Sequence, residues 1–203
     1  MTPPSAPARQ PSLQEARKAF ARAHISQAAR ELFFTQGYGA TTFDQIAKAA
    51  GTRRTTLYSH FRDKAEILEQ IADEYQDGLC ALVAILDGPV PTRAQIEAWI
   101  AVLVDFVQRE RAPATLVIGL GIGQDTPDAI QRTSERFPQA LAARISAFGN
   151  ALDEGHPRTR AWAKVILREL SLACLQAARQ DVGSADGIAV VTDLFDWFVR
   201  EHA

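Results

Sequence analysis

The sequence predicts an all-α protein in two parts, a three-helix head that contains a helix-turn-helix and a six-helix body. Apolar residues recur at the three- and four-residue spacing of amphipathic helices, and no segment shows the strict alternation of a half-buried strand. With 203 residues, of which 47% are hydrophobic and 23% charged, the chain can bury a substantial core. We expect a disordered tail over 1–11, the head over 12–64 and the body over 65–203.

The expected tail contains four prolines, which prevent regular backbone hydrogen bonding. Ser12 is then placed to cap a helix that runs toward Gln36. The basic residues near this end form either an arm that touches phosphates or a minor groove, or part of a solubilising tail. These residues are Arg9, Arg17, Lys18 and Arg22.

The first helix of the head has one apolar stripe, with the i, i+3, i+4, i+7, i+8 pattern of an amphipathic helix. The stripe consists of Ile25, Ala28, Ala29, Leu32 and Phe33. Gly37 follows where a left-handed cap ends a helix. The stripe therefore faces the two helices that come next.

Two short helices around a tight glycine turn follow. Thr42 and Gln45 have the spacing of a capping box, which marks a helix start. Gly51 stands where the chain reverses, and Leu57 and Phe61 share one face beyond the turn. The inward residues before the turn are Phe43, Ile46, Ala47 and Ala50. Three helices then enclose one small core.

The outer face of the third helix is crowded with hydrogen-bond donors, as expected of a helix that enters a nucleic-acid groove. These residues are Arg53, Arg54, Thr55, Thr56, Tyr58, Ser59 and His60. The alternative is a plain packing corner with a solvated polar face.

Charge is divided between the two parts. Residues 1–64 contain ten Lys and Arg against four Asp and Glu, a balance of +6, whereas the remainder has a balance of −8. A basic head suits the phosphate backbone and an acidic body is repelled by it, which predicts salt-sensitive binding.

The order and spacing of these residues resemble the N-terminal domain of TetR-family transcriptional regulators over residues 22–68. The matching segments are Ala28-Ala29-Arg30-Glu31-Leu32-Phe33, Gly37-Tyr38, Thr42 to Gly51 and Thr56-Leu57-Tyr58-Ser59-His60-Phe61, followed by Lys64 and Leu68. Beyond them the resemblance rests on length and helical character. It implies a dimeric DNA-binding regulator whose body binds a small molecule.

Three residues depart from the usual family pattern at the start of the third helix, namely Thr52, Arg53 and Thr55. We expect Thr52 to take over the cap and shift the helix start by one residue. Arg53 can then reach either a phosphate or a guanine edge.

The candidate DNA contacts fall into two groups. We assign phosphate contacts to Thr42, Thr56, Tyr58 and Lys64. We assign base edges to Arg53, Arg54, Thr55, Ser59 and His60.

The body is predicted to be helical throughout. The expected helices cover 65–86, 92–111, 114–123, a segment from 127 to 155 that Pro138 kinks or splits, 158–180 and 188–201. Pro113 is expected to break the second of them.

The last two long helices offer more apolar area than one side of each needs in a monomer, which favours a four-helix bundle between two copies. The candidate dimer residues are Ile166, Leu167, Leu170, Cys174, Val191, Leu194, Phe195 and Phe198. The alternative is that these faces are buried internally. A two-fold dimer requires a roughly palindromic operator.

The resemblance also implies an effector cavity between the middle helices. Its candidate lining is Tyr75, Leu79, Trp99, Leu103, Phe106 and Trp162, with Arg168 and Glu169 as polar anchors. The alternative is ordinary core for the aromatic residues and a solvated pair for the last two. Few polar groups converge, which favours a mostly apolar ligand.

Other classes of function have weaker support. Gly119-Leu120-Gly121-Ile122-Gly123 looks like the turn of a dinucleotide-binding unit, but Gln124 replaces its third glycine and no alternating strands surround it. We expect neither a catalytic set, a metal site nor a cofactor. Cys80 and Cys174 read as buried thiols of a cytoplasmic protein without an export signal.

The sequence therefore predicts a cytoplasmic, homodimeric repressor that a small effector releases from double-stranded DNA. The alternatives are a DNA-binding dimer without an effector, and an all-helical enzyme or small-molecule-binding protein.

Overall fold

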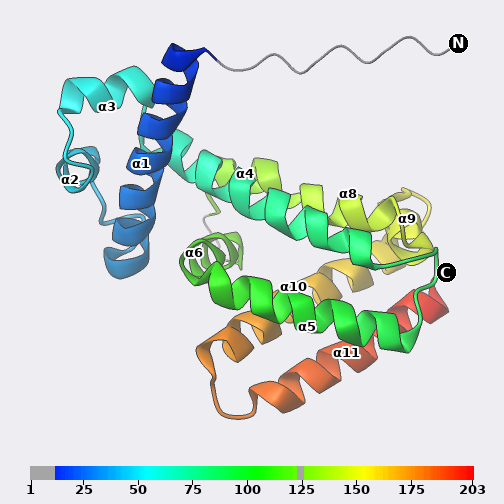
Figure 1. Cartoon of the computed structure of the whole chain (residues 1–203). Coiled ribbons are helices and arrows are strands. Elements are labelled where there is room, and N and C mark those ends of the chain that lie inside the picture. Colours follow the sequence, from blue (N-terminus) through cyan, green and yellow to red (C-terminus); the bar gives the residue numbers. More distant parts are fainter. Residues whose placement is uncertain (1–11, 123–125) are drawn as a thin grey trace, which may run out of the picture. The chain divides into compact units, whose positions relative to one another are not determined.

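The structure, a computed structural model, describes residues 12–122 and 126–203, and these ranges contain helices and turns but no β-strand (Figure 1). The predicted all-α fold class is confirmed. The predicted tail and Gly123 lie outside the described residues. The chain divides into two compact units that meet between Ile67 and Leu68.

The head consists of α1 (Leu13–Gln36), α2 (Phe43–Ala49) and α3 (Arg54–His60), which pack pairwise around one core. The predicted cap of α1 is confirmed, because the Glu15 N–H donates to Ser12 Oγ at 3.2 Å and the Ser12 N–H donates to Glu15 Oε2 at 2.7 Å. Gly37 ends α1 with a positive φ of 86°, but its ψ of 152° differs from that of the predicted left-handed cap. The core contains Ile25, Ala29, Phe33, Ile46, Leu57 and Phe61, each at most 3% exposed.

The turn between α2 and α3 is a Schellman motif. Gly51 has φ 59°, its N–H donates to the Lys48 carbonyl at 3.1 Å, and the Thr52 N–H donates to the Ala47 carbonyl at 2.9 Å. The predicted capping box at Thr42 and Gln45 is present at the other end of α2. The first helix of the helix-turn-helix, α2, therefore begins at a capping box and ends at a Schellman turn.

The predicted role of Thr52 as the cap of α3 is wrong. Thr52 belongs to the turn that closes α2, so the extended residue before α3 is Arg53, which makes no side-chain capping hydrogen bond. The start of α3 is consequently set by the turn rather than by a hydroxyl cap.

The body follows from α4, which spans the boundary between the two units. Its elements are α4 (Lys64–Leu82), a 3-10 turn η1 (Val83–Ile85), α5 (Arg93–Arg109), α6 (Arg111–Ile122), α7 (Asp128–Ser134), α8 (Arg136–Ala142), α9 (Ser146–Leu152), α10 (Pro157–Arg179) and α11 (Ser184–Glu201). None of the helices in the described part of the chain is long and apolar enough to cross a membrane.

The described body contains more helices than the six predicted, because the segment between residues 126 and 155 forms three short ones. Pro138 splits the segment between α7 and α8, as predicted. It lacks the N–H that would donate to the Ser134 carbonyl four residues earlier, and α7 ends at Ser134, so Pro138 lies in the first turn of α8. Pro113 occupies the same position in α6, and the break lies ahead of it at Glu110. The chain thus starts a new helix just before each proline.

The central helix of the body is α10, which packs against α5, α6, α9 and α11; α5, α10 and α11 run side by side in Figure 1. An aromatic cluster joins α5, α9 and α11. The Phe195 ring of α11 lies 5.1 Å from Trp99 on α5 and 5.5 Å from Phe148 on α9. All three side chains are at most 2% exposed, so this cluster is the tightest part of the body core.

We predict that Gly51→Ala lowers the free energy of unfolding of the head by about 1 to 2 kcal/mol, the cost of a left-handed backbone for a residue with a Cβ. A Cβ at Gly51 meets no atom within 4 Å, so the cost is confined to the backbone. Denaturant unfolding measures it. Gly39→Ala is the matched control, because Gly39 is equally open and lacks a positive φ. Equal stability of the two variants contradicts this account.

Candidate functional site

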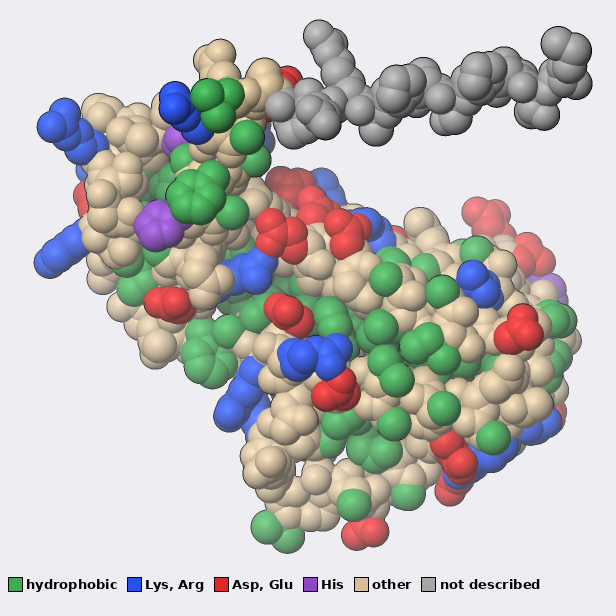
Figure 2. Space-filling model, viewed as in Figure 1, with side chains coloured by type: hydrophobic (Ala, Val, Ile, Leu, Met, Phe, Trp, Pro, Cys, Tyr) green, Lys and Arg blue, Asp and Glu red, His purple; other side chains and the backbone are tan. Residues whose placement is uncertain are grey.

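The outward surface of α3 presents a row of donors. Leu57 is completely buried, and the residues on the other side of the helix are exposed. Those residues are Arg53, Arg54, Thr55, Thr56, Tyr58 and Ser59. Figure 2 shows Lys and Arg side chains projecting from the head and Asp and Glu side chains spread over the visible face of the body. This outward surface of α3 is the candidate nucleic-acid interface.

Arg54 is held between α2 and α3. Its Nη1 lies 2.9 Å from Asp44 Oδ2, and its Nη2 donates to the Tyr58 hydroxyl at 3.3 Å. The hydrogen bond that Arg54 donates to Tyr58 and the charge of Asp44 raise the pKa of Arg54. Because the pair is exposed to solvent, we treat it as a means of orienting the guanidinium and not as a source of stability.

The hydroxyl side chains of the interface are already engaged within the head. Thr42 Oγ1 accepts from the Gln45 N–H in the capping box, and Ser59 Oγ donates to the Thr56 carbonyl at 2.7 Å. The Tyr58 ring packs 4.9 Å from Phe43, which fixes its direction. These contacts set the orientation of the side chains.

Two predicted DNA contacts lie away from the open surface. His60 is half-buried, and its Nδ1 is shielded from solvent without a hydrogen-bond partner in the described structure. Lys64 Nζ donates to the carbonyls of Tyr38, Gly39 and Thr41 at 2.8, 3.3 and 3.0 Å. The ammonium group therefore ties the loop between α1 and α2 to the start of α4.

Arg22, one of the basic residues expected in either an arm or a solubilising tail, is partly buried against the head, with 28% of its side chain exposed. Its guanidinium lies 4.0 Å from the centre of the Phe61 ring, donates to the His60 carbonyl and lies 3.4 Å from Glu66. Arg17 and Lys18 are exposed on α1, and Arg9 lies outside the described residues. Only part of the proposed arm is thus open to a ligand.

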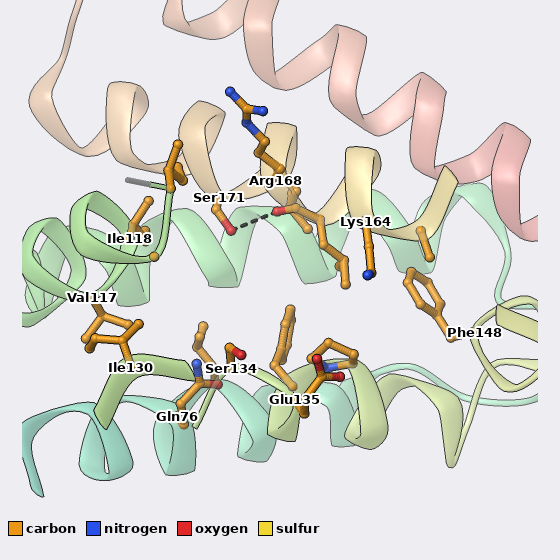
Figure 3. A pocket seen from close by; sticks show the side chains of 18 of the residues that line it. Gln76, Val117, Ile118, Ile130, Ser134, Glu135, Phe148, Lys164, Arg168 and Ser171 are labelled. Atoms are coloured by element: carbon orange, nitrogen blue, oxygen red, sulfur yellow. Dashed lines mark hydrogen bonds between the residues drawn. The ribbon is translucent and has the colours of Figure 1, made fainter. Parts of the chain in front are cut away.

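A cavity of about 800 Å³ lies within the body. Helices α4 to α10 all contribute to its wall, and Figure 3 shows two facing sides, one with Gln76, Ser134 and Glu135 and the other with Lys164 and Ser171. Apolar side chains form most of the lining, including Leu79, Leu103, Val117, Ile118, Phe148 and Leu170. Its size is typical of small-molecule sites.

Polar groups in the wall differ in how far they are already satisfied. Arg160 donates to the carbonyls of Ala151 and Asp153 at 3.1 and 2.9 Å, and Ser171 donates to the Leu167 carbonyl at 2.8 Å. Gln76 is 7% exposed, and its Oε1 is buried without a hydrogen-bond partner.

Four of the eight predicted effector residues line this cavity, namely Tyr75, Leu79, Leu103 and Arg168. The other four lie elsewhere. Trp99 is fully buried in the aromatic cluster, and Phe106 packs on Tyr75 with 5.5 Å between ring centres. Trp162 packs edge-on against Trp197, and Glu169 is exposed.

Most of the residues predicted for a dimer interface belong to the core of a single chain. The buried ones are Ile166, Leu170, Cys174, Val191, Phe195 and Phe198, each at most 3% exposed. Leu167, Leu170 and Cys174 line the cavity. The internal-burial alternative holds for these side chains because α10 is covered by α5, α6, α9 and α11. Leu194 remains partly exposed.

A different set of apolar side chains on α10 and α11 faces outward. Val165, Val190 and Trp197 are 47%, 65% and 40% exposed, and Trp162 and Leu194 are partly exposed. Residues 190, 194 and 197 share one face of α11, and 162 and 165 share one face of α10. The Trp162 and Trp197 rings meet at 5.0 Å and join the two rows. We call these five residues the α10–α11 stripe.

Ion pairs join α4 to the segment that forms the cavity wall at Ser134 and Glu135. Arg132 lies 2.8 Å from Glu69, and Arg136 lies 3.2 Å from Asp73 and also contacts Asp77. Ser134 and Glu135 stand between these two arginines in the chain. These ion pairs connect the wall at Ser134 and Glu135 to α4.

Sequence reasoning missed Gln76 and Asp44. Gln76 occupies the fourth position after Ala72 in a helical stripe that also contains Tyr75 and Leu79, so a polar residue on a buried face was the available signal. For Asp44 no such signal exists. Its partner Arg54 is ten residues away, across a turn whose geometry only the folded chain defines.

A family model and several characterised regulators match the sequence of the head. The profile described as "Bacterial regulatory proteins, tetR family" matches residues 25–71. The HTH-type transcriptional regulator AcrR of Shigella flexneri is 44% identical over 50 residues, which are 25% of this chain and 23% of AcrR. The transcriptional activator FasR of Mycolicibacterium smegmatis is 30% identical over 44% of this chain and 41% of FasR. The chain thus aligns with less than half the length of these relatives.

A longer match extends through the body. The HTH-type transcriptional regulator AlkX of Mycobacterium tuberculosis is 33% identical over 180 residues, which cover 86% of this chain and 84% of AlkX. The helix-turn-helix head and the helical body place the chain in the class of helix-turn-helix proteins. Within that class, the chain belongs to the TetR family of bacterial regulatory proteins.

Solved structures share the fold over nearly the whole chain. A TetR-like transcriptional regulator from Rhodococcus sp. RHA1 has a TM-score of 0.66 at 16% identity and covers 96% of this chain and 100% of its own. Salmonella enterica GusR has a TM-score of 0.63 at 20% identity, covering 86% and 94%. At this identity the likeness shows the fold.

We predict that Lys64→Met destabilises the head by about 1 to 3 kcal/mol, because three carbonyls lose a charged donor. Thermal unfolding of the DNA-free protein measures the loss. Lys48→Met is the matched control, since Lys48 is exposed on α2 and its loss leaves stability within about 0.5 kcal/mol. If both variants unfold like the parent and only DNA affinity falls, Lys64 is a phosphate contact and the structural role is wrong.

Proposed function

We propose that the protein is a sequence-specific DNA-binding transcriptional regulator that acts as a homodimer and is controlled by a small molecule. The observation that carries this proposal is the open row of donors on α3, held in place by the Schellman turn at Gly51 and the contacts of Arg54. A helix with such a face fits the major groove, where Arg and hydroxyl side chains read base edges. Membership of the TetR family supports the same function.

The residues with the most direct access to DNA are those that remain exposed. We assign base contacts to Arg53, Arg54, Thr55 and Ser59, and phosphate contacts to Thr42, Thr56 and Tyr58. Lys64 contributes mainly by holding the head together, and His60 is only half-exposed. The positive balance of residues 1–64 favours approach with this end toward DNA.

The α10–α11 stripe is the dimer surface that we propose in place of the predicted one. It is apolar, continuous across two helices and exposed in the single chain. Pairing two copies of these helices gives a four-helix bundle. A dimer with two-fold symmetry presents two α3 helices to a roughly palindromic operator.

The cavity in the body is the proposed effector site. A ligand that enters it touches Ser134 and Glu135, and the ion pairs from Arg132 and Arg136 transmit a shift of that wall to α4. Because α4 begins directly after the head in the chain, its displacement changes the presentation of α3. Two ligand-dependent positions of α4 are sufficient to alter affinity for DNA.

We propose that the regulator represses transcription in the cytoplasm and that its effector releases it. The names of its relatives cover both directions of control, since BepR of Brucella suis is a transcriptional repressor and FasR is an activator. Release by a ligand lifts repression without any further part of the protein, which is the simpler arrangement for the described chain.

Two other classes predict different behaviour. An all-helical enzyme turns over a substrate and ignores DNA. A dimer without an effector binds an operator whose occupancy no small molecule changes. We favour neither class. An enzyme does not need the exposed donors of α3, and a dimer without an effector does not need the cavity in the body.

The decisive experiment selects bound fragments from a genomic DNA library with the purified full chain at low salt. We expect recovered fragments to share one roughly palindromic element, with affinity that falls steeply as salt rises. Recovery of unrelated fragments, or of none, overturns the proposal.

Substitutions on α3 separate base reading from backbone contact. We predict that Arg54→Ala costs about 1 to 3 kcal/mol on the preferred operator and relaxes preference at one base pair. Tyr58→Phe weakens binding to all sequences alike because a phosphate contact carries no base information. Mobility-shift titrations on operator variants measure both effects. Arg179→Ala, exposed at the end of α10, is the control. Unchanged affinity in both test variants shows that another surface reads DNA.

We also predict that Val165→Glu halves the mass of the protein in solution, because a charge in the α10–α11 stripe is desolvated on pairing. Sedimentation or light scattering at micromolar concentration gives the mass. Val182→Glu is the matched control, since Val182 is fully exposed in the connection between α10 and α11, outside the stripe. Persistence of the dimer in Val165→Glu places the interface elsewhere.

A further inference from the structure

We propose that the body cavity takes an uncharged amphipathic molecule whose hydrogen-bond donor, a hydroxyl or an amide N–H, binds Gln76 Oε1 while its apolar body fills the rest. This inference rests on the proposed effector function and names the chemistry of the ligand. It follows from one unsatisfied atom, the way the other polar groups of the wall are used, and the position of the charges.

Gln76 is the group that the folded chain leaves incomplete. It lies on the buried side of α4, is 7% exposed, and its Oε1 has neither solvent nor a protein donor within hydrogen-bond distance in the described structure. Figure 3 shows its side chain on the same side of the cavity as Ser134, facing α10. A buried acceptor without a partner is costly, so such an atom at a cavity wall points to a ligand donor.

Other polar groups of the wall have partners already. Ser134 Oγ donates to the Gln131 carbonyl at 2.7 Å, and Ser171 Oγ donates to the Leu167 carbonyl at 2.8 Å. The guanidinium of Arg160 is directed to main-chain carbonyls of the segment after α9. Gln76 is therefore the wall group whose need for a partner selects the ligand.

The charged side chains of the wall have access to solvent. Glu135, Glu154, Lys164 and Arg168 are all exposed, and the partly buried Arg160 is already bound to main-chain carbonyls, so none of the five offers a buried, unpaired charge to an ion. A charge placed beside Gln76 loses its hydration without meeting an opposite charge. The part of the ligand that reaches Gln76 is accordingly neutral.

The titratable groups deep in the wall are neutral as well. Burial raises the pKa of the Tyr75 phenol and raises that of the Cys174 thiol to about 12. Both groups are protonated at neutral pH, so neither supplies a charge to pair with an ion. Around them the lining is aliphatic or aromatic, including Leu79, Leu103 and Val117, which suits a hydrocarbon body.

The test compares two isomers, 1-decanol and 1-methoxynonane, which have the same atoms and nearly the same apolar surface. The alcohol donates a hydrogen bond and the ether does not. Isothermal titration calorimetry of each probe into the full chain without DNA gives the ratio of their dissociation constants. The same ratio is measured for Gln76→Met, which keeps the volume of the side chain and removes its hydrogen-bonding groups.

We expect the parent protein to bind 1-decanol about five- to tenfold more tightly than the ether, the effect of one buried hydrogen bond. The ratio falls to about one in Gln76→Met. Gln108→Met is the matched control, because Gln108 is exposed on α5 and does not line the cavity, and its ratio stays at the parent value. Equal binding of the probes by the parent, an unchanged ratio in Gln76→Met, or no saturable binding of 1-decanol overturns the proposal.

Stability of the ligand-free protein gives a second readout. Replacing an unsatisfied buried amide by an apolar side chain removes a cost, so we expect Gln76→Met to melt about 2 to 4 °C above the parent. A lower melting temperature shows that Gln76 supports the fold and contradicts a role reserved for the ligand.

These measurements do not depend on the proposed regulation of DNA binding. If the alcohol binds as expected and DNA affinity is unaffected by any ligand, the regulatory proposal fails and the ligand class stands. If DNA is released by molecules that bind independently of Gln76, the ligand class fails and the regulatory proposal stands.

Discussion

The packing of α10 against α5, α6, α9 and α11 is the interaction on which the body depends. It draws Ile166, Leu170 and Phe195 into the core of one chain, and it leaves the α10–α11 stripe exposed. The cavity lies between α10 and α4, and α5, α6 and α9 also line it. One helix thus shares its circumference between core, cavity and surface, and a change in its packing affects all three.

In the head, a core of a few side chains holds the short helix α3 in place. The outer face of α3 remains exposed to solvent. Three devices supply the rigidity. The Schellman turn fixes the angle between α2 and α3, Lys64 ties down the loop after α1, and Arg22 covers the Phe61 ring. Each of them places polar groups within the head, so that the exposed donors of α3 are directed outward and preorganised for a partner.

The cavity shows how a binding site departs from the rules that stabilise a core. Most of its wall obeys them, with apolar side chains facing inward and Ser171 and Arg160 satisfied by the main chain. Gln76 breaks them, because a buried acceptor lacks a donor. Natural proteins accept such costs where function needs them. The ion pairs from Arg132 and Arg136 join the wall at Ser134 and Glu135 to α4, the helix that also carries Gln76.

The sequence alone determined the all-α class, the cap at Ser12, the capping box at Thr42 and Gln45, the glycine turn and the family, because these depend on local spacing and on residues that act within one or two helical turns. It also indicated Tyr75, Leu79, Leu103 and Arg168 correctly as cavity residues. The tertiary structure decided which apolar faces are internal, that Trp99 lies in the core and Phe106 packs on Tyr75, and that Lys64 binds carbonyls. Periodicity shows that a helix has an apolar face, but only the packed chain shows which neighbour covers it, because that depends on contacts between residues far apart in the sequence.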